Sequence, residues 1–161
     1  MAIQATIKSN SKIISKKFKK LQDKLPRFID KGLKQAGFHL LDIVRTKTKK
    51  GQDFRGRPFA PYSEGYLKRL SKEGKSTKID LFYSGKMMGS LTPSSTVKKS
   101  GRNKVSLAFS NAEQRTKALF NQVTGDPKRE FFGFNSRTEM IISKAFNKFV
   151  EKEIRGMRLW V

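Results

Sequence analysis

Cysteine is absent from the 161 residues, and histidine and tryptophan occur once each. Without cysteine the chain has neither a disulfide framework nor a thiolate metal site, which favours a protein that folds in a reducing cytoplasm. The single histidine, His39, cannot build a structural zinc site alone, so we expect no metal and no cofactor. His39 falls in the middle of a predicted helix, where an ordinary helical histidine is the simplest interpretation.

Acidic residues and long apolar runs are also scarce. No stretch approaches the ~20 consecutive apolar residues that cross a membrane, and the first twelve residues lack the apolar run of a signal peptide. We therefore expect neither a membrane protein nor a secreted one. The few carboxylates of the middle segment are scattered, at Asp53, Glu64, Glu73 and Asp80. Because no segment concentrates acids as two-metal or glycosidase sites do, we predict that the chain is not an enzyme, although distant carboxylates can still meet in a fold.

One short segment has a partial resemblance to a phosphate-binding loop. Ser84, Gly85 and Lys86 match the end of that motif. However, Asp80 stands where the motif needs its first glycine, and Met87 stands where it needs serine or threonine. An acid at Asp80 would also repel phosphate, so this motif is excluded.

Basic residues dominate the composition: 36 Lys and Arg against 13 Asp and Glu give a formal charge of +23. The excess decreases along the chain, from +11 in residues 1–50 (14 − 3) to +8 in 51–110 (12 − 4) and +4 in 111–161 (10 − 6). A fold with this charge repels itself unless a polyanion or an acidic neighbour compensates it. Nucleic acid is the first candidate partner and an acidic protein surface the second. A lysine-rich surface that serves solubility alone is the third interpretation.

A run of six lysines without an acid lies near the N-terminus. These lysines can follow a phosphate backbone, form the solvated face of a helix, or belong to a basic amphipathic helix that meets a membrane surface or a partner groove. No recognition-helix, zinc-finger or RNA-binding aromatic pattern accompanies them, so any contact with DNA is expected to be independent of its sequence. The polyanion-facing candidates are Lys8, Lys12, Lys16, Lys17, Lys19 and Lys20.

The apolar spacing predicts two helices before residue 50. Pro26 lacks the backbone N–H that an interior helical turn needs, so we expect one helix to end near Lys24 and another to begin near Pro26, with Asp23 as a possible cap. Gly51 is expected to end the second helix. Residues 2–7 alternate weakly and fit a short strand. The buried stripe predicted for the second helix is Ile29, Leu33, Ala36, Leu40, Leu41 and Val44.

The rest of the chain mixes loops, short elements and one long helix. Residues 112–123 fit a helix and a strand equally well. The stripe predicted for the C-terminal helix is Met140, Ile141, Ala145, Phe149 and Ile154. The other expected elements are an irregular, aromatic-rich segment at 51–80, a short helix at 86–90, a hairpin with strands at 96–99 and 104–110 and a turn at 100–103, and a buried strand at 130–134.

Helices at both ends of a hairpin-bearing middle predict an α+β fold. We expect a small antiparallel sheet with N-terminal and C-terminal helices packed against it. The chain is short and has no linker, which favours a single domain over residues 1–161. Its parts are N-terminal helices at about 11–50, a motif-bearing loop and sheet region at about 51–134, and a C-terminal helix at about 136–156.

Three segments are rich in glycine and aromatic residues, and the first and third also contain proline. The first reads FRGRPFAPYS at 54–63, followed by YLKRL. The second reads LFYSGKMMGSL at 81–91. The third reads ALFNQVTG at 118–125, followed by PKREFFGF at 127–134. Such residues are common in loops, so the signal lies in their order, their spacing and the helices that flank them.

In this order the segments resemble the virion morphogenesis proteins of tailed bacteriophages, also called tail-completion or neck proteins. The family patterns are Gly-x-Pro-aromatic-Ala-Pro-Leu-Ser, then Leu-x-x-Ser/Thr-Gly-x-Leu-x-x-Ser, then Ala-x-x-His-Gln-x-Gly with Pro-x-Arg-x-Phe-Leu-Gly before a C-terminal helix. The resemblance covers residues 25–155 approximately. It implies a small α+β structural virion protein without enzymatic activity, made in the host cytoplasm and located at the head–tail junction. The implied partners are further copies in a homo-oligomeric ring, neighbouring neck or connector proteins, and tail-tube or tail-terminator proteins, with non-specific contact to packaged DNA a further possibility.

The resemblance also selects residues for assembly contacts. Asn121 stands where the family usually has His, while Phe59 and Phe132 stand where Trp and Leu are common, which preserves apolar character at the latter two. Phenylalanines are more often core residues, so Tyr62 is the better interface candidate. The interface candidates are Phe54, Arg57, Pro58, Phe59, Tyr62, Gly85, Met88, Arg129, Phe131 and Phe132. The alternative function is a sequence-independent nucleic-acid-binding or packaging accessory protein, because the charge alone suffices for it.

Overall fold

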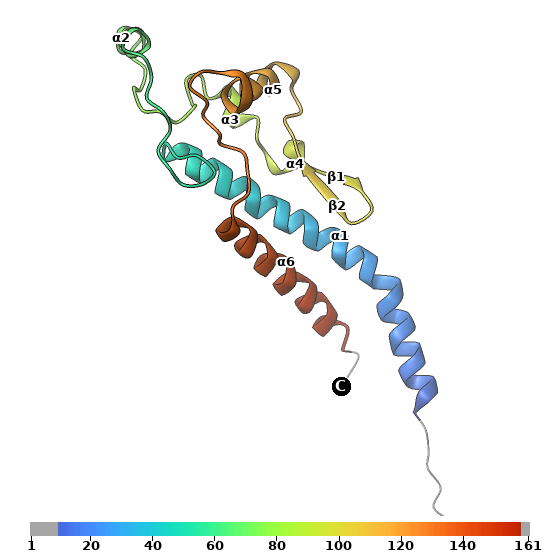
Figure 1. The fold of residues 1–161 in the computed structure, drawn as a ribbon. Helices are drawn as coiled ribbons and strands as arrows, with labels where there is room; N and C mark the ends of the chain where they lie inside the picture. The colour runs from blue at the N-terminus through green and yellow to red at the C-terminus, as the bar shows by residue number, and fades with distance from the viewer. Residues whose placement is uncertain (1–9, 159–161) are drawn as a thin grey trace, which may run out of the picture.

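Two long helices lie side by side, and the shorter elements gather around one end of the longer helix (Figure 1). The structure is a computed structural model of the 161-residue chain that describes residues 10–158. The fold class is α+β, as the sequence predicts, while the strand expected at 2–7 falls outside the described residues. The elements are α1 Ser11–Lys49, α2 Glu64–Lys72, α3 Lys86–Gly89, α4 Pro93–Thr96, β1 Val97–Gly101, β2 Lys104–Leu107, α5 Ala112–Leu119, the π-helical turn η1 Phe120–Thr124, and α6 Ser136–Gly156.

The prediction of two N-terminal helices is wrong, because α1 continues through Pro26, and Asp23 caps nothing. Proline removes one helical hydrogen bond and crowds the preceding turn. The cost is outweighed here because one apolar face runs across it: Leu25 is half-buried before the proline and Phe28 is buried after it. Figure 1 shows that the axis of α1 changes direction in this part of the helix, as expected at a proline.

The second half of α1 forms the centre of the fold. Of the stripe predicted for it, Ala36, Leu40, Leu41 and Val44 are buried, and the remaining two residues are half-buried. Gly51 follows the helix with φ +78°, a left-handed conformation that favours glycine, so the predicted end of this helix is confirmed.

Two glycines let α1 pack closely on both sides. A Cβ at Gly37 would lie 2.7 Å from a methyl carbon of Val97, so the hairpin rests directly on the helix there. A Cβ at Gly32 would lie 3.0 Å from the ring of Phe146 in α6. Because residues 32 and 37 point to different sides of a helix with 3.6 residues per turn, α1 lies between the hairpin and α6.

The predicted hairpin is confirmed in outline. Strands β1 and β2 pair antiparallel, with Val97 opposite Leu107 and Lys99 opposite Val105, and the turn falls within residues 100–104. Asn103 adopts a φ of +54°, which asparagine tolerates better than most residues. The hairpin buries Val97 against α1 and exposes the lysines of β1 to solvent.

Two predictions for the loops were wrong. Segment 51–80, expected to be irregular, contains α2, whose first turn is capped because Ser63 accepts a hydrogen bond from the backbone N–H of Tyr66 (3.4 Å). Segment 130–134 is not a strand. Its backbone is paired instead by the side chain of Gln122, which donates to the carbonyl oxygen of Phe132 (2.6 Å) and accepts from its N–H (3.0 Å). The predicted short helix at 86–90 is confirmed as α3, and the ambiguous segment 112–123 is helical.

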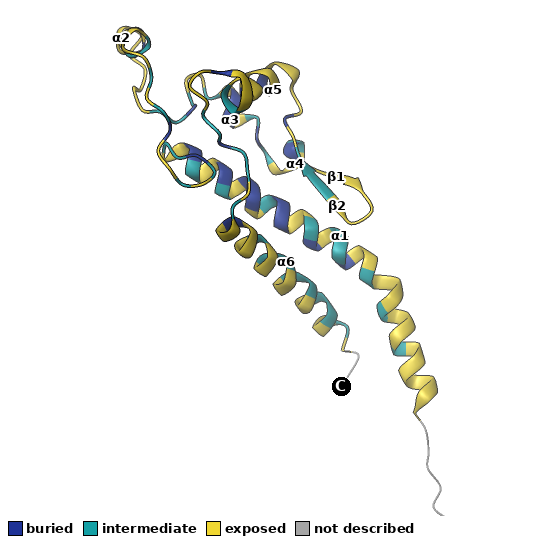
Figure 2. Cartoon of the chain, in the orientation of Figure 1, coloured by how far each residue is buried: buried dark blue, intermediate teal, exposed yellow. Residues whose placement is uncertain are grey.

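The apolar core lies where α1, the hairpin, α3, α5 and the 131–132 loop meet, and Figure 2 shows burial concentrated there. Part of the stripe predicted for α6 was wrong, because Met140 and Ile141 are 68% and 44% exposed. The side of α6 that faces α1 carries Phe146 and Val150 instead. None of the described helices is both long and apolar enough to span a membrane.

Candidate functional site

The three motif segments, far apart in the sequence, meet around one cleft of about 420 Å³, here called the motif cleft. The first segment contributes Tyr62, the second Gly85, and the third Asn121 and Arg129. The convergence is a property of the fold, because residues 62 and 129 are separated by α2, α3, α4, the hairpin and α5. The cleft is therefore the natural candidate for the function that the motifs serve.

Arg129 fastens the third segment to the first. Its guanidinium donates hydrogen bonds to the carbonyl oxygens of Ala60 (3.1 Å) and Pro61 (2.9 Å) and lies 4.8 Å from the ring centre of Tyr62. Its backbone N–H donates to the carbonyl oxygen of Asn121 (2.7 Å). These contacts join the first motif segment to both parts of the third through one residue, so Arg129 shapes the cleft and is only partly available to a partner.

Tyrosines form one wall of the motif cleft. The rings of Tyr62 and Tyr66 meet edge to face at 4.9 Å, a favourable aromatic geometry. Burial raises the pKa of the Tyr62 phenol, and the neighbouring Tyr66 raises it further. At neutral pH Tyr62 therefore keeps its proton and can donate a hydrogen bond. Tyr83, which is 45% exposed, donates a hydrogen bond to Glu73 (2.6 Å), and this bond raises the pKa of its phenol.

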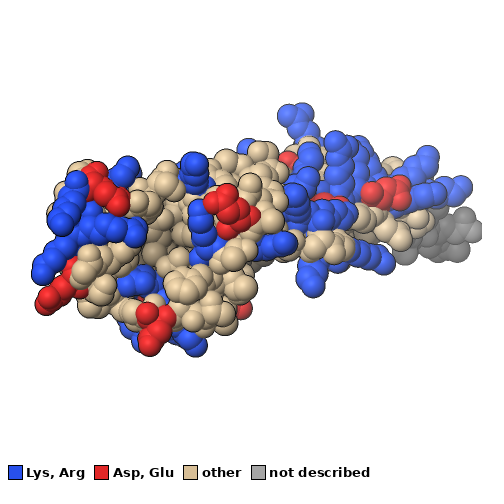
Figure 3. Space-filling model, turned by 90° about the horizontal axis from the view of Figure 1, so that it is seen from above, with Lys and Arg blue, Asp and Glu red and all other residues tan. Residues whose placement is uncertain are grey.

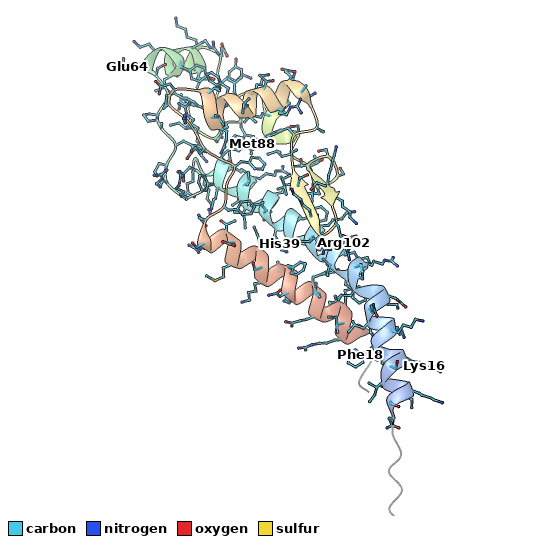
Figure 4. The ribbon with its side chains drawn as sticks, turned by 45° about the vertical axis from the view of Figure 1, so that its right-hand side comes forward. Lys16, Phe18, His39, Glu64, Met88 and Arg102 are labelled. Atoms are coloured by element: carbon cyan, nitrogen blue, oxygen red, sulfur yellow. The ribbon has the colours of Figure 1, made fainter. Side chains whose placement is uncertain are left out.

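The second segment turns sharply into α3 at the edge of the cleft. Gly85 has a φ of +69°, a left-handed conformation that other residues rarely adopt, and it precedes the first residue of α3. The turn directs Met87 and Met88 inward, where both are buried. Gly85 thus lines the cleft with backbone, and Figure 4 shows Met88 inside the molecule.

The first segment is held by an ion pair at its start. Asp53 accepts hydrogen bonds from the backbone N–H (2.8 Å) and the Nε (2.9 Å) of Arg57. Burial raises the pKa of Asp53, but the hydrogen bonds from Arg57 outweigh it, so the pKa lies below its ordinary value. Asn135 and Lys47 both donate to the carbonyl oxygen of Phe54 (2.8 and 2.7 Å), which ties this loop to the last turn of α1 and to the start of α6.

The interface candidates divide by exposure. Phe59, Met88 and Phe131 are at most 6% exposed and belong to the chain's own core, which is the alternative role that phenylalanine favours. Arg57 and Pro58 are exposed. The half-buried candidates are Phe54, Tyr62, Gly85, Arg129 and Phe132.

Two contributors to this region were not selected from the sequence. Phe120 lines the motif cleft and is 59% exposed. It lies within the third motif but is not among the interface candidates. Gln122 holds the loop at 131–132 through its paired hydrogen bonds to Phe132. Gln122 lies inside the third motif segment, which is the sequence feature that could have selected it.

The lysine candidates occupy the first turns of α1. Lys12, Lys16, Lys19 and Lys20 are exposed and Lys17 is half-buried, while Lys8 falls outside the described residues. Figure 3 shows Lys and Arg side chains gathered over the narrow end of the molecule. This basic region and the motif cleft are separate, because none of these lysines lines the cleft.

Titratable groups that could perform chemistry do not gather. Within residues 10–158 no group of three His, Cys, Asp or Glu side chains is close enough to hold a metal ion. His39 is exposed on α1 (Figure 4). The cleft therefore offers hydrogen-bonding and aromatic surface for binding, and the prediction that the chain is not an enzyme stays a prediction.

The chain was compared with models of protein families, with curated proteins and with solved structures, and none of the three comparisons gives a match.

Proposed function

We propose that this chain is a structural subunit of the head–tail junction of a tailed bacteriophage, where it helps to join the DNA-filled head to the tail. The observation that carries the proposal is the convergence of the three motif segments on the motif cleft. Residues that merely filled loops would have no reason to meet at one surface site.

The properties of the cleft suit contact with another protein. Aromatic and arginine side chains concentrate binding energy in interfaces, and the cleft presents Tyr62, Tyr66, Phe120 and Arg129. Phe120 and Tyr83 stand at least 45% exposed at the same cleft. A neighbouring subunit that covered these rings would remove apolar surface from water, which favours association.

Rigid support makes such a site useful in assembly. Hydrogen bonds from Arg129, Gln122 and Asn135 fix the loops that carry the motif residues. A surface held in place before binding loses less conformational entropy when a partner arrives. The motif-bearing loops would thus have two tasks, to hold the cleft in shape and to present its aromatic rings.

Two exposed phenylalanines provide a matched test. Phe120 lines the motif cleft, whereas Phe134, 62% exposed, does not. A phage that lacks the gene is complemented with Phe120→Ala or with Phe134→Ala, and joined particles are counted by electron microscopy. We expect Phe120→Ala to lower the joined fraction and Phe134→Ala to leave it unchanged. Equal yields from the two variants, both shown to fold by circular dichroism, would contradict a role for the cleft.

A further inference from the structure

The most charged surface of the molecule is built from two elements. Residues 11–34 of α1 contain nine basic and two acidic side chains, and residues 97–107 of the hairpin contain four basic and none acidic. The hairpin lies against α1 over Gly37 and reaches Asp30, to which Lys99 donates at 2.5 Å. Val97, at the start of the hairpin, lies at Gly37, and Lys99, closer to the turn, reaches Asp30. The turn therefore points toward the N-terminal half of α1.

Six of the nine basic residues in this part of α1 lie on one face of the helix. Counted from Asp30, which Lys99 contacts, these six residues lie 3, 4, 10, 11, 14 and 18 positions away, and at 3.6 residues per turn all of them fall within about 100° of one another around the helix. Figure 4 shows Arg102 at the hairpin turn and Lys16 on α1, nearer the N-terminus of the chain. The members of this basic face are Lys12, Lys16, Lys19, Lys20, Arg27 and Lys34 from α1, and Lys98, Lys99, Arg102 and Lys104 from the hairpin.

Carboxylates hardly neutralise the basic face. Asp30 is engaged by Lys99, and in the part of the chain that the structure describes no carboxylate lies within ion-pair distance of Lys12, Lys16, Lys19, Lys20 or Arg27. Unpaired cations on one face repel each other and attract counterions. A polyanion that displaced those counterions would bind with a gain in entropy.

We propose that the basic face binds the phosphate backbone of double-stranded nucleic acid, independently of its sequence. Residues 11–34 of a helix extend about 36 Å, close to the ~34 Å of one duplex turn. The exposed ring of Phe18 points about 100° around α1 from Lys19, away from the basic face, so it offers no stacking platform there for an unpaired base, which favours a duplex over a single strand. Ile13, 56% exposed, borders the basic face beside Lys16 and Lys20, but a single isoleucine falls short of the apolar centre that a stable interface with an acidic protein would need. This inference does not depend on the proposed role at the head–tail junction.

The salt dependence of binding measures the proposed contact. The full chain is titrated against a labelled duplex of about 30 base pairs by fluorescence anisotropy at several salt concentrations. Four to six phosphate contacts predict an affinity that falls on the order of 10²- to 10³-fold between 50 and 200 mM salt. Poly-glutamate of equal total charge serves as the competitor that represents an acidic protein.

Charge-reversal variants at three places distinguish binding by a defined surface from attraction by the net charge of the protein. The α1 variant carries Lys16→Glu, Lys19→Glu and Lys20→Glu, and the hairpin variant carries Arg102→Glu and Lys104→Glu. The control reverses three exposed lysines on α6, which lie away from the basic face: Lys144, Lys148 and Lys152.

We expect the α1 and hairpin variants to bind at least about tenfold more weakly with a shallower salt slope, and the α6 control to change affinity less than about threefold. Circular dichroism checks that each variant keeps the helical content of the parent. A loss in the α6 control equal to that in the α1 variant would overturn the proposal, since net charge alone would then explain binding. So would an unchanged affinity in the hairpin variant, or displacement of the duplex by poly-glutamate at equal charge.

Discussion

Truncation of Phe131 tests whether the third motif supports the core or presents a ring to a partner. The side chain is 1% exposed, and its ring centre lies 5.2 Å from that of Phe132 and 6.4 Å from that of Phe109. Burying a phenylalanine removes 150 Å² or more from water, which at ~25 cal/mol per Å² is worth roughly 4 kcal/mol. The cavity that remains adds to the loss, so we expect Phe131→Ala to lower the free energy of unfolding by about 3–5 kcal/mol.

Urea unfolding followed by circular dichroism measures this free energy by linear extrapolation. Because a loss of this size is a large fraction of the stability of an ordinary domain, Phe131→Leu provides a milder variant with an expected cost below about 1.5 kcal/mol. Phe134→Ala is the matched control, since it removes a ring that is 62% exposed and should change stability by less than about 0.5 kcal/mol. If Phe131→Ala cost no more than Phe134→Ala, the ring would not be part of the core and the reasoning would be refuted.

Three further predictions concern single positions. Because Arg57 lowers the pKa of Asp53 in the folded state, the ion pair stabilises the fold above about pH 4 and is lost as the pH falls through the folded pKa. The difference in unfolding free energy between the parent and Asp53→Asn should therefore shrink below pH 4, and a constant difference from pH 3 to 7 would contradict this. A Cβ at Gly125 would lie 2.7 Å from the carbonyl oxygen of Phe120, so Gly125→Ala should cost about 1–3 kcal/mol, measured by urea unfolding. Pro26→Ala restores a hydrogen bond inside α1 and should raise the free energy of unfolding by up to about 3 kcal/mol, whereas no gain would argue against a continuous helix.

The predictions that the structure confirms rest on patterns formed by residues close together in the sequence. The hairpin was predictable because strand alternation and a turn with Gly and Asn fall within a dozen residues. The stripe from Ala36 to Val44 was predictable because its residues recur at helical spacing and lie in the part of α1 that forms the core. The α+β class follows from these elements and the C-terminal helix.

The errors came from interactions between distant residues. Pro26 looked like a helix end because propensity is local, but burial of one apolar face on both sides of it keeps α1 continuous. Residues 130–134 looked like a strand because they are apolar, yet the side chain of Gln122 takes the place of a strand partner. Met140 and Ile141 looked like part of the stripe, and only the position of α6 on Gly32 shows that Phe146 and Val150 face inward.

The candidate site was visible in the sequence only as separate motifs. Their order indicated which segments matter, and the core preference of phenylalanine favoured burial of Phe59 and Phe131, but the sequence did not show that the segments meet or that Met88 is buried beneath them. Hydrogen bonds that span 68 and 69 residues, from Arg129 to Pro61 and Ala60, bring the segments together. Such contacts have no local signature.

The most direct test of the central claim is to disrupt this gene in the genome that carries it and to image the lysate by electron microscopy. The proposed role at the head–tail junction predicts DNA-filled heads and finished tails that remain separate, and joined particles again when the parent gene is supplied in trans. Normal joined particles without the gene would contradict the account.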